Sequence, residues 1–95
     1  MDTTSTLRAT VRGFVQGVGF RVFVRSAAWH LNVRGYVKNM PDGTLQVVAA
    51  GSRAALDKLL AEIWRGPAGA HITAVDTSWE EGESVGLGPT FEVRP

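Results

Sequence analysis

The chain has 95 residues, of which 44% are hydrophobic, 20% are charged and none is cysteine, and its formal net charge is +1. This composition predicts one small globular domain and excludes disulfides and thiolate metal sites, and the net charge is too small for the strongly basic surface that nucleic-acid binding requires. The polar first residues, MDTTSTLR, do not resemble a signal peptide and no apolar run is long enough to cross a bilayer, so we expect a cytoplasmic protein without a membrane partner.

The first part of the chain predicts a strand, a glycine-rich loop and a helix. Apolar and polar residues alternate over residues 7–12, as in a half-buried strand. The segment GFVQGVGFR, residues 13–21, then interrupts this pattern with three glycines and ends in Arg21. From residue 22 to residue 31, the apolar residues recur at the spacing of an amphipathic helix.

The middle of the chain predicts a hairpin followed by a second helix. Alternation returns over residues 33–39 and again over residues 45–50. Between them lies MPDGT, residues 40–44, which has the Pro, Asp and Gly of a tight turn. Ser52 is suited to be the N-cap of a second helix, which ends before GPAG at residues 66–69.

Two further strands complete the predicted fold. Residues 75–79 and residues 90–94 have the strand pattern, and the acidic, glycine-rich segment 80–89 between them is expected to be a surface loop. The order βαββαβ predicts a ferredoxin-like α+β sandwich, with an antiparallel sheet, an additional short C-terminal strand and two helices on one face. This fold supports many activities, so it does not identify the function.

The positive charge of the chain is concentrated in its first half. Residues 1–51 include six basic and two acidic side chains, a net charge of +4, whereas residues 52–95 have a net charge of −3. The first half is therefore the more favourable half for a small anion. An uneven distribution of this kind also arises from solvated faces.

The glycine loop, residues 16–20, is suited to bind such an anion. Between a strand end and a helix N-terminus, backbone N–H groups lack partners and the helix dipole is positive. Glycines allow consecutive N–H groups to turn inward around an anion. Arg21 opposes the helix dipole unless it contacts a bound phosphate. Alternatively, the glycines only shape a tight turn, and Arg21 is a solvated surface residue.

Two well-known phosphate-binding motifs do not fit this loop. The Walker motif requires a lysine directly after its last glycine, and none is present. The dinucleotide motif Gly-x-Gly-x-x-Gly accounts for Gly17 and Gly19 but requires a third glycine where Val22 stands. The loop therefore belongs to a different class.

Two motifs together resemble those of the acylphosphatase family. Its first motif, approximately Gly-x-Val-Gln-Gly-Val-x-Phe-Arg, is matched by Gly13, Val15, Gln16, Gly17, Val18, Phe20 and Arg21. Its second motif, which begins Gly-aromatic-Val-basic-Asn, is matched by Gly35, Tyr36, Val37, Lys38, Asn39, Gly43, Leu45 and Gly51. Leu45 departs from the more usual valine at a position expected in the core. The resemblance covers the whole chain, which we divide into a flexible tail, residues 1–6, and one acylphosphatase-like domain, residues 7–95.

The resemblance implies hydrolysis of the carboxyl–phosphate bond of a small acyl phosphate, at a site that needs no metal or cofactor. In this family, the amides of the glycine loop and the following arginine bind the phosphate, and the asparagine of the second motif positions the attacking water. The implied catalytic residues are Arg21 and Asn39. The implied phosphate-binding residues are Gln16, Gly17, Val18, Gly19, Phe20 and Arg21. We expect a monomer.

Two alternatives have a different function on a similar fold. An RRM-like RNA-binding module shares the sandwich, and RGFVQGVGF begins like its aromatic motif, but Val15 and Gln16 break the match. The motif would also follow the first strand instead of lying on the third. The second alternative is a domain that handles carbamoyl phosphate, as found at the start of hydrogenase-maturation proteins. Because this chain stops at one domain, a free-standing hydrolase is favoured.

Overall fold

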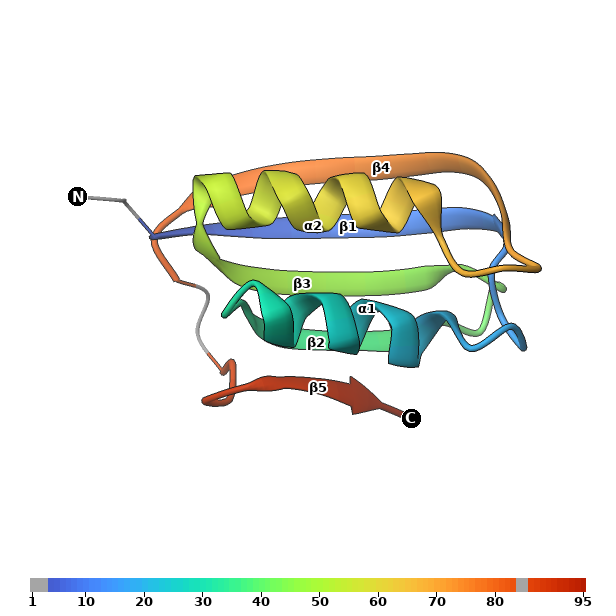
Figure 1. Ribbon diagram of the computed structural model, residues 1–95, viewed down its shortest axis with the longest axis horizontal. Coiled ribbons are helices and arrows are strands. Elements are labelled where there is room, and N and C mark those ends of the chain that lie inside the picture. Colours follow the sequence, from blue (N-terminus) through green and yellow to red (C-terminus); the bar gives the residue numbers. More distant parts are fainter. Residues whose placement is uncertain (1–3, 84–85) are drawn as a thin grey trace.

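The computed structural model describes residues 4–83 and 86–95, which form five strands and two helices (Figure 1). In chain order, the elements are β1 Thr4–Phe14, α1 Phe20–His30, β2 Arg34–Asn39, β3 Leu45–Ser52, α2 Arg53–Arg65, β4 His71–Glu81 and β5 Phe91–Arg94. The predicted ferredoxin-like fold with an added C-terminal strand is confirmed. Neither helix in the described residues has the length and apolar character of a membrane-spanning segment.

The sheet is mixed, because β2 pairs with β3 in the antiparallel direction and with β5 in the parallel direction. The strand order is β4-β1-β3-β2-β5. The pairs β1–β4, β1–β3 and β2–β3 are antiparallel, as expected, whereas β5 runs parallel to β2. The expected antiparallel sheet is thus correct for the first four strands only. The physical reason is that the chain crosses from β4 to the opposite edge before β5 begins, so β5 enters beside β2 in the same direction.

Both helices pack on one face of the sheet and bury the core between the layers (Figure 1). The alternation in β1 places Leu7, Ala9 and Val11 in the core at 2% exposure or less. Each helix contributes residues at helical spacing: Phe20, Val24 and Ala28 from α1, and Leu56, Leu59 and Ile63 from α2. The apolar periodicity in the sequence therefore predicted the buried faces correctly.

The two helices begin in different ways. Ser52 has extended backbone and its hydroxyl accepts a hydrogen bond from the N–H of Ala55 at 3.1 Å, which confirms the predicted N-cap. The first helix begins at Phe20, two residues earlier than predicted. Its N-cap is Gly19, whose left-handed backbone (φ 76°) lets the helix follow the glycine directly, without a side-chain cap.

The expected N-terminal tail and the expected acidic loop are both shorter than predicted, because β1 and β4 extend further than their sequence patterns indicated. Residues 4–6, expected in a flexible tail, belong to β1 and pair with residues 50–52 of β3. Residues 1–3 of the expected tail lie outside the described residues. Glu80 and Glu81, expected in the acidic loop, belong to β4 and pair with Thr6 and Ser5 of β1. Residues 84–85 of that loop also lie outside the described residues.

Candidate active site

The glycine loop connects the end of β1 to the start of α1 with an unusual backbone. Gly17 and Gly19 both have φ of 76°, a conformation that residues with a side chain rarely adopt. A Cβ atom added at either position would have no heavy atom within 4 Å. Glycine is therefore required here by the backbone conformation and not by lack of space, as an inward-facing row of amides demands.

Several backbone N–H groups of this segment have no hydrogen-bond acceptor among residues 4–83 and 86–95. The first helical hydrogen bond of α1 runs from the N–H of Phe23 to the carbonyl of Gly19 at 3.1 Å, so the preceding N–H groups of α1 have no acceptor in the helix. In the described part of the chain, the N–H groups of Gly17, Val18 and Gly19 donate no hydrogen bond either. Together with the positive end of the helix dipole, these donors form a site suited to an anion.

Arg21 lies in the first turn of α1 and is held by the last strand. Its side chain is half-buried, and its Nη1 donates a hydrogen bond to the carbonyl of Arg94 in β5 at 3.1 Å. One guanidinium nitrogen is thus used by the backbone, while the remaining donors stay available for a ligand. The contact with β5 fixes the position of the guanidinium, and it was not predicted from the sequence because it joins residues 73 positions apart.

Asn39 is the last residue of β2, and it stands next to the turn that leads to β3. It is half-buried and pairs with Leu45 across the hairpin. Within the described residues, its carboxamide makes no hydrogen bond. A polar side chain that is half-buried without a protein partner is free to bind a ligand or a water molecule.

A small cavity brings the loop, Arg21 and Asn39 together. It measures about 140 Å³, and it is lined by Val15, Gly17, Gly19, Phe20, Arg21, Val22, Asn39 and Val93. Four of the residues in the predicted phosphate-binding set line it, whereas Gln16 and Val18 do not. Val15, Val22 and Val93 line it as well and were not predicted as site residues. The signal for Val22 was its place directly after Arg21, but nothing in the sequence indicated that β5 would bring Val93 to the same cavity.

The side chain of Gln16 points to the neighbouring hairpin turn instead of the cavity. Its Nε2 donates to the carbonyl of Met40 at 2.9 Å and to the carbonyl of Thr44 at 3.0 Å. The glycine loop and the turn, residues 40–44, accordingly lie at the same end of the molecule (Figure 1). Any contact of Gln16 with a phosphate is thus limited to its backbone.

The turn is itself fixed by a charged residue. The hydroxyl and the backbone N–H of Thr44 both donate to Oδ1 of Asp42, at 2.6 and 3.0 Å. These two hydrogen bonds, with a smaller contribution from the charge of Arg12, hold the pKa of Asp42 below its usual value. Asp42 is therefore a carboxylate at neutral pH, and it orders the turn next to Asn39.

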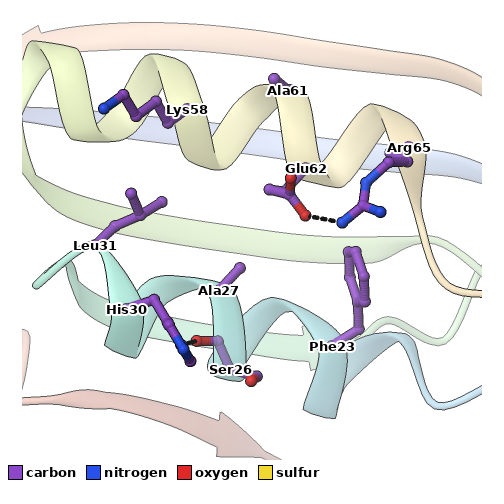
Figure 2. A pocket seen from close by; sticks show the side chains of 9 residues that line it. All are labelled: Phe23, Ser26, Ala27, His30, Leu31, Lys58, Ala61, Glu62 and Arg65. Carbon is purple, nitrogen blue, oxygen red and sulfur yellow. Dashed lines mark hydrogen bonds and ion pairs between the residues drawn. The ribbon is translucent and has the colours of Figure 1, made fainter.

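A larger cavity lies elsewhere, in the groove between the two helices (Figure 2). It measures about 540 Å³ and is bordered by Phe23 of α1, by Leu31 directly after α1 and by Lys58 of α2. Glu62 and Arg65 form an ion pair on its α2 side. It contains neither the glycine loop nor Asn39. The smaller cavity is the candidate active site, because unpaired amides, the guanidinium of Arg21 and the carboxamide of Asn39 meet there.

Side chains that could hold a metal ion do not gather in groups of three or more within residues 4–83 and 86–95. The donors at the candidate site are N–H groups and one carboxamide, and N–H groups bind anions, whereas metal ions require lone pairs. The chemistry that this donor set can perform is the binding of a phosphate group and the orientation of a polar molecule next to it.

Comparison with known proteins gives the same family throughout. A family model described as acylphosphatase matches residues 7–92. The acylphosphatase of Deinococcus radiodurans is 47% identical over 75 residues, which cover 79% of this chain and 86% of that protein. The acylphosphatase of Thermus thermophilus is 44% identical over 81 residues, 85% of this chain and 90% of that protein.

Solved structures agree with the sequence relatives. The acylphosphatase from Bacillus subtilis superposes with a TM-score of 0.89 at 30% identity, over 96% of this chain and 99% of that one. Full-length HypF in a phosphate- and nucleotide-bound form matches all of this chain with a TM-score of 0.87 at 26% identity, but over 12% of its own length. With relatives of this identity that match over most of their length, and a glycine loop and Asn39 at one cavity, the chain belongs to the acylphosphatase family and is a hydrolase of acyl phosphates.

Proposed function

We propose that the small cavity is the active site and that the phosphate group of the substrate binds in the glycine loop. The observation that supports this is the meeting of Gly17 and Gly19, Arg21 and Asn39 at one cavity. The backbone N–H groups from Gln16 to Phe20 surround the phosphate, and Arg21 adds a charge-assisted contact from the side of α1. All residues predicted to bind phosphate then act through their backbone, except Arg21.

Asn39 has the complementary role of orienting the attacking water. Its carboxamide oxygen can accept a hydrogen bond from the water while its N–H group donates one to a phosphate oxygen. An amide is too weak a base to remove the proton of the water, so this proton passes to a phosphate oxygen or to solvent as the new bond forms. Asn39 thus contributes by position, which is the main requirement of phosphoryl transfer.

The reaction needs few other groups. The oxygen of the water attacks phosphorus, and the bond between phosphorus and the acyl oxygen breaks, which releases a carboxylate and inorganic phosphate. Because a carboxylic acid has a pKa of about 4, the carboxylate leaves without a proton donor. The amides and Arg21 stabilise the negative charge of the transferring group, the role that metal ions have in many other phosphoryl-transfer enzymes. Hydrolysis without metal or cofactor is therefore part of the proposal.

Arg21 and Asn39 can be tested by hydrolysis of benzoyl phosphate in the presence of EDTA. We expect activity to survive the chelator. Arg21→Ala is expected to raise KM and weaken inhibition by inorganic phosphate, because it removes the charged contact, and to lower kcat by about a hundredfold. Asn39→Ala is expected to keep phosphate inhibition within about twofold and to lower kcat by about a hundredfold, because it removes only the positioning of water.

Matched controls distinguish a site effect from a general one. Arg65→Ala removes a different arginine, one that borders the larger cavity. Asn32→Gly removes the other asparagine of the sequence. The backbone of Asn32 has a φ of 56°, which glycine adopts freely. Both are expected to hydrolyse benzoyl phosphate at the rate of the unmodified protein. Retention of that rate by Arg21→Ala and Asn39→Ala would show that the site is elsewhere.

The alternatives and the finer predictions have separate tests. Carbamoyl phosphate has the same carbonyl–oxygen–phosphorus bond, so a carbamoyl-phosphate-handling role would use the same cavity and would appear as a strong preference for this substrate over benzoyl phosphate. The RNA-binding alternative is not supported, because the segment that it requires lies in β1 and the glycine loop and not on the third strand.

The predicted monomer and cytoplasmic location are tested by sedimentation and by cell fractionation.

A further inference from the structure

The carboxamide of Gln16 connects two parts of the candidate site that are distant in sequence. Both of its N–H donors are used, one for the carbonyl of Met40 at 2.9 Å and one for the carbonyl of Thr44 at 3.0 Å. Gln16 directly precedes Gly17 of the glycine loop, and Met40 directly follows Asn39. The side chain thus joins the segment that would hold phosphate to the turn that directly follows Asn39, the residue that would hold water.

The hairpin turn does not need Gln16 to satisfy its own backbone. The carbonyl of Met40 also accepts from the N–H of Gly43 at 3.1 Å, and the carbonyl of Thr44 also accepts from the N–H of Met40 at 2.8 Å. Asp42 accepts both polar groups of Thr44. Each carbonyl thus keeps a partner when Gln16 is removed, so its loss leaves no buried acceptor unpaired. What the two bonds add is a fixed distance between the turn and the glycine loop.

We propose that Gln16 is a positioning residue, whose side chain holds Asn39 at the correct distance from the bound phosphate. This inference rests on the proposed function of Asn39. Gln16 touches no reacting atom through its side chain, since that side chain does not line the cavity. Its effect therefore passes through Asn39: the phosphate still binds in the glycine loop, but the water is no longer aimed at phosphorus. Small errors of position at a reacting atom lower rates strongly.

The variant that tests this is Gln16→Met, which keeps the length and volume of the side chain but cannot donate a hydrogen bond. We expect kcat for benzoyl phosphate to fall about tenfold. Inhibition by inorganic phosphate is expected to stay within about twofold of the unmodified protein. If Gln16 served only in folding, Gln16→Met would lower the unfolding temperature, but it would not lower kcat while leaving inhibition by phosphate unchanged. Gln46→Met is the matched control, because Gln46 is a half-buried glutamine of β3 that does not line the cavity.

A double-mutant cycle with Asn39→Ala shows through which residue Gln16 acts. If Gln16 acts through Asn39, adding Gln16→Met to Asn39→Ala lowers kcat no further. A double variant in which the two losses multiply would overturn the inference, as would a single Gln16→Met variant with unchanged kcat or with lost phosphate inhibition. Gln16→Asn is one methylene too short to reach both carbonyls, and it serves as the second variant if Gln16→Met does not fold.

The cycle also separates this inference from the proposed function. An unchanged kcat in Asn39→Ala contradicts the proposed role of Asn39, whatever Gln16 does. A low kcat in Asn39→Ala together with a normal kcat in Gln16→Met contradicts only the role of Gln16.

Discussion

At the scale of single residues, the glycines of the two motifs are required for two different reasons. A Cβ atom added at Gly35 would lie 1.9 Å from the carbonyl oxygen of Val48, and one added at Gly13 would lie 2.0 Å from the carbonyl oxygen of His71. Gly17 and Gly19 have open space around them but left-handed backbone. The first pair thus permits close strand contact, and the second permits the shape of the glycine loop.

This difference predicts that alanine at Gly35 mainly lowers stability, whereas alanine at Gly19 mainly weakens phosphate binding. Gly35→Ala is expected to lower the free energy of unfolding by about 3 kcal/mol or more, because a backbone clash adds to strained φ. Gly19→Ala is expected to lower it by only about 1 kcal/mol but to weaken inhibition by inorganic phosphate, because the loop relaxes. Urea denaturation and inhibition assays measure the two effects. Equal losses of stability at both positions would contradict this account.

Asp42 predicts how the stability of the turn depends on pH. Its pKa is lowered in the folded protein, chiefly by the hydroxyl of Thr44, so the carboxylate form stabilises the fold. That contribution is fully present above the ordinary pKa of an aspartate, about 4, and is lost as pH falls through the lower pKa of the folded state. Asp42→Asn should therefore be less stable than the unmodified protein at pH 7, and the difference should shrink towards about pH 2. A constant difference from pH 7 to pH 2, measured by urea denaturation, would contradict this role.

At the scale of elements, β5 contributes to the site although it is the last and shortest strand. Phe91 anchors it in the core at 1% exposure, and the carbonyl of Arg94 accepts the hydrogen bond from Arg21. The side chain of Arg94 points to other partners, the carboxylate of Glu92 and the ring of Tyr36, whose centroid is 3.9 Å away. In the candidate site, the guanidinium of Arg21 is therefore held by the backbone of β5 and not by the side chain of Arg94.

Two variants of this strand should behave differently. Removing residues 94–95 deletes the carbonyl that holds Arg21, so the KM for benzoyl phosphate is expected to rise about fivefold, the equivalent of one hydrogen bond. Arg94→Ala keeps this carbonyl and is expected to leave KM within about twofold. A steady-state titration compares them. If Arg94→Ala raised KM as much as the deletion, the side chain and not the backbone would be responsible.

At the scale of the whole molecule, stability comes from one core between the sheet and the helices. The ion pairs Arg8–Glu80 and Arg12–Asp76 join β1 and β4, and their side chains are 40–62% exposed. Ion pairs of this kind contribute little, because water and salt screen them. The core residues of both helices, by contrast, are completely buried at positions such as Leu59.

A pair of substitutions tests this distribution of stability. Leu59→Ala is expected to lower the free energy of unfolding by about 2–5 kcal/mol, because it removes buried methyl groups and leaves a cavity. Arg12→Ala is expected to change it too little to measure, in low salt or in high salt. Both values come from urea denaturation. A strongly salt-dependent stability of the unmodified protein would show that the ion pairs matter more than their exposure indicates.

The sequence by itself determined the local features: alternating strands, two amphipathic helices, the Ser52 cap, the turn at residues 40–44 and the two motifs that led to Arg21 and Asn39. These follow from periodicity and backbone preference, which act over a few residues. Only the tertiary structure decided the parallel entry of β5, the contact of Arg21 with Arg94 and the two hydrogen bonds of Gln16. Those contacts join segments at least 24 positions apart, and no local pattern specifies which distant backbone group a side chain will reach.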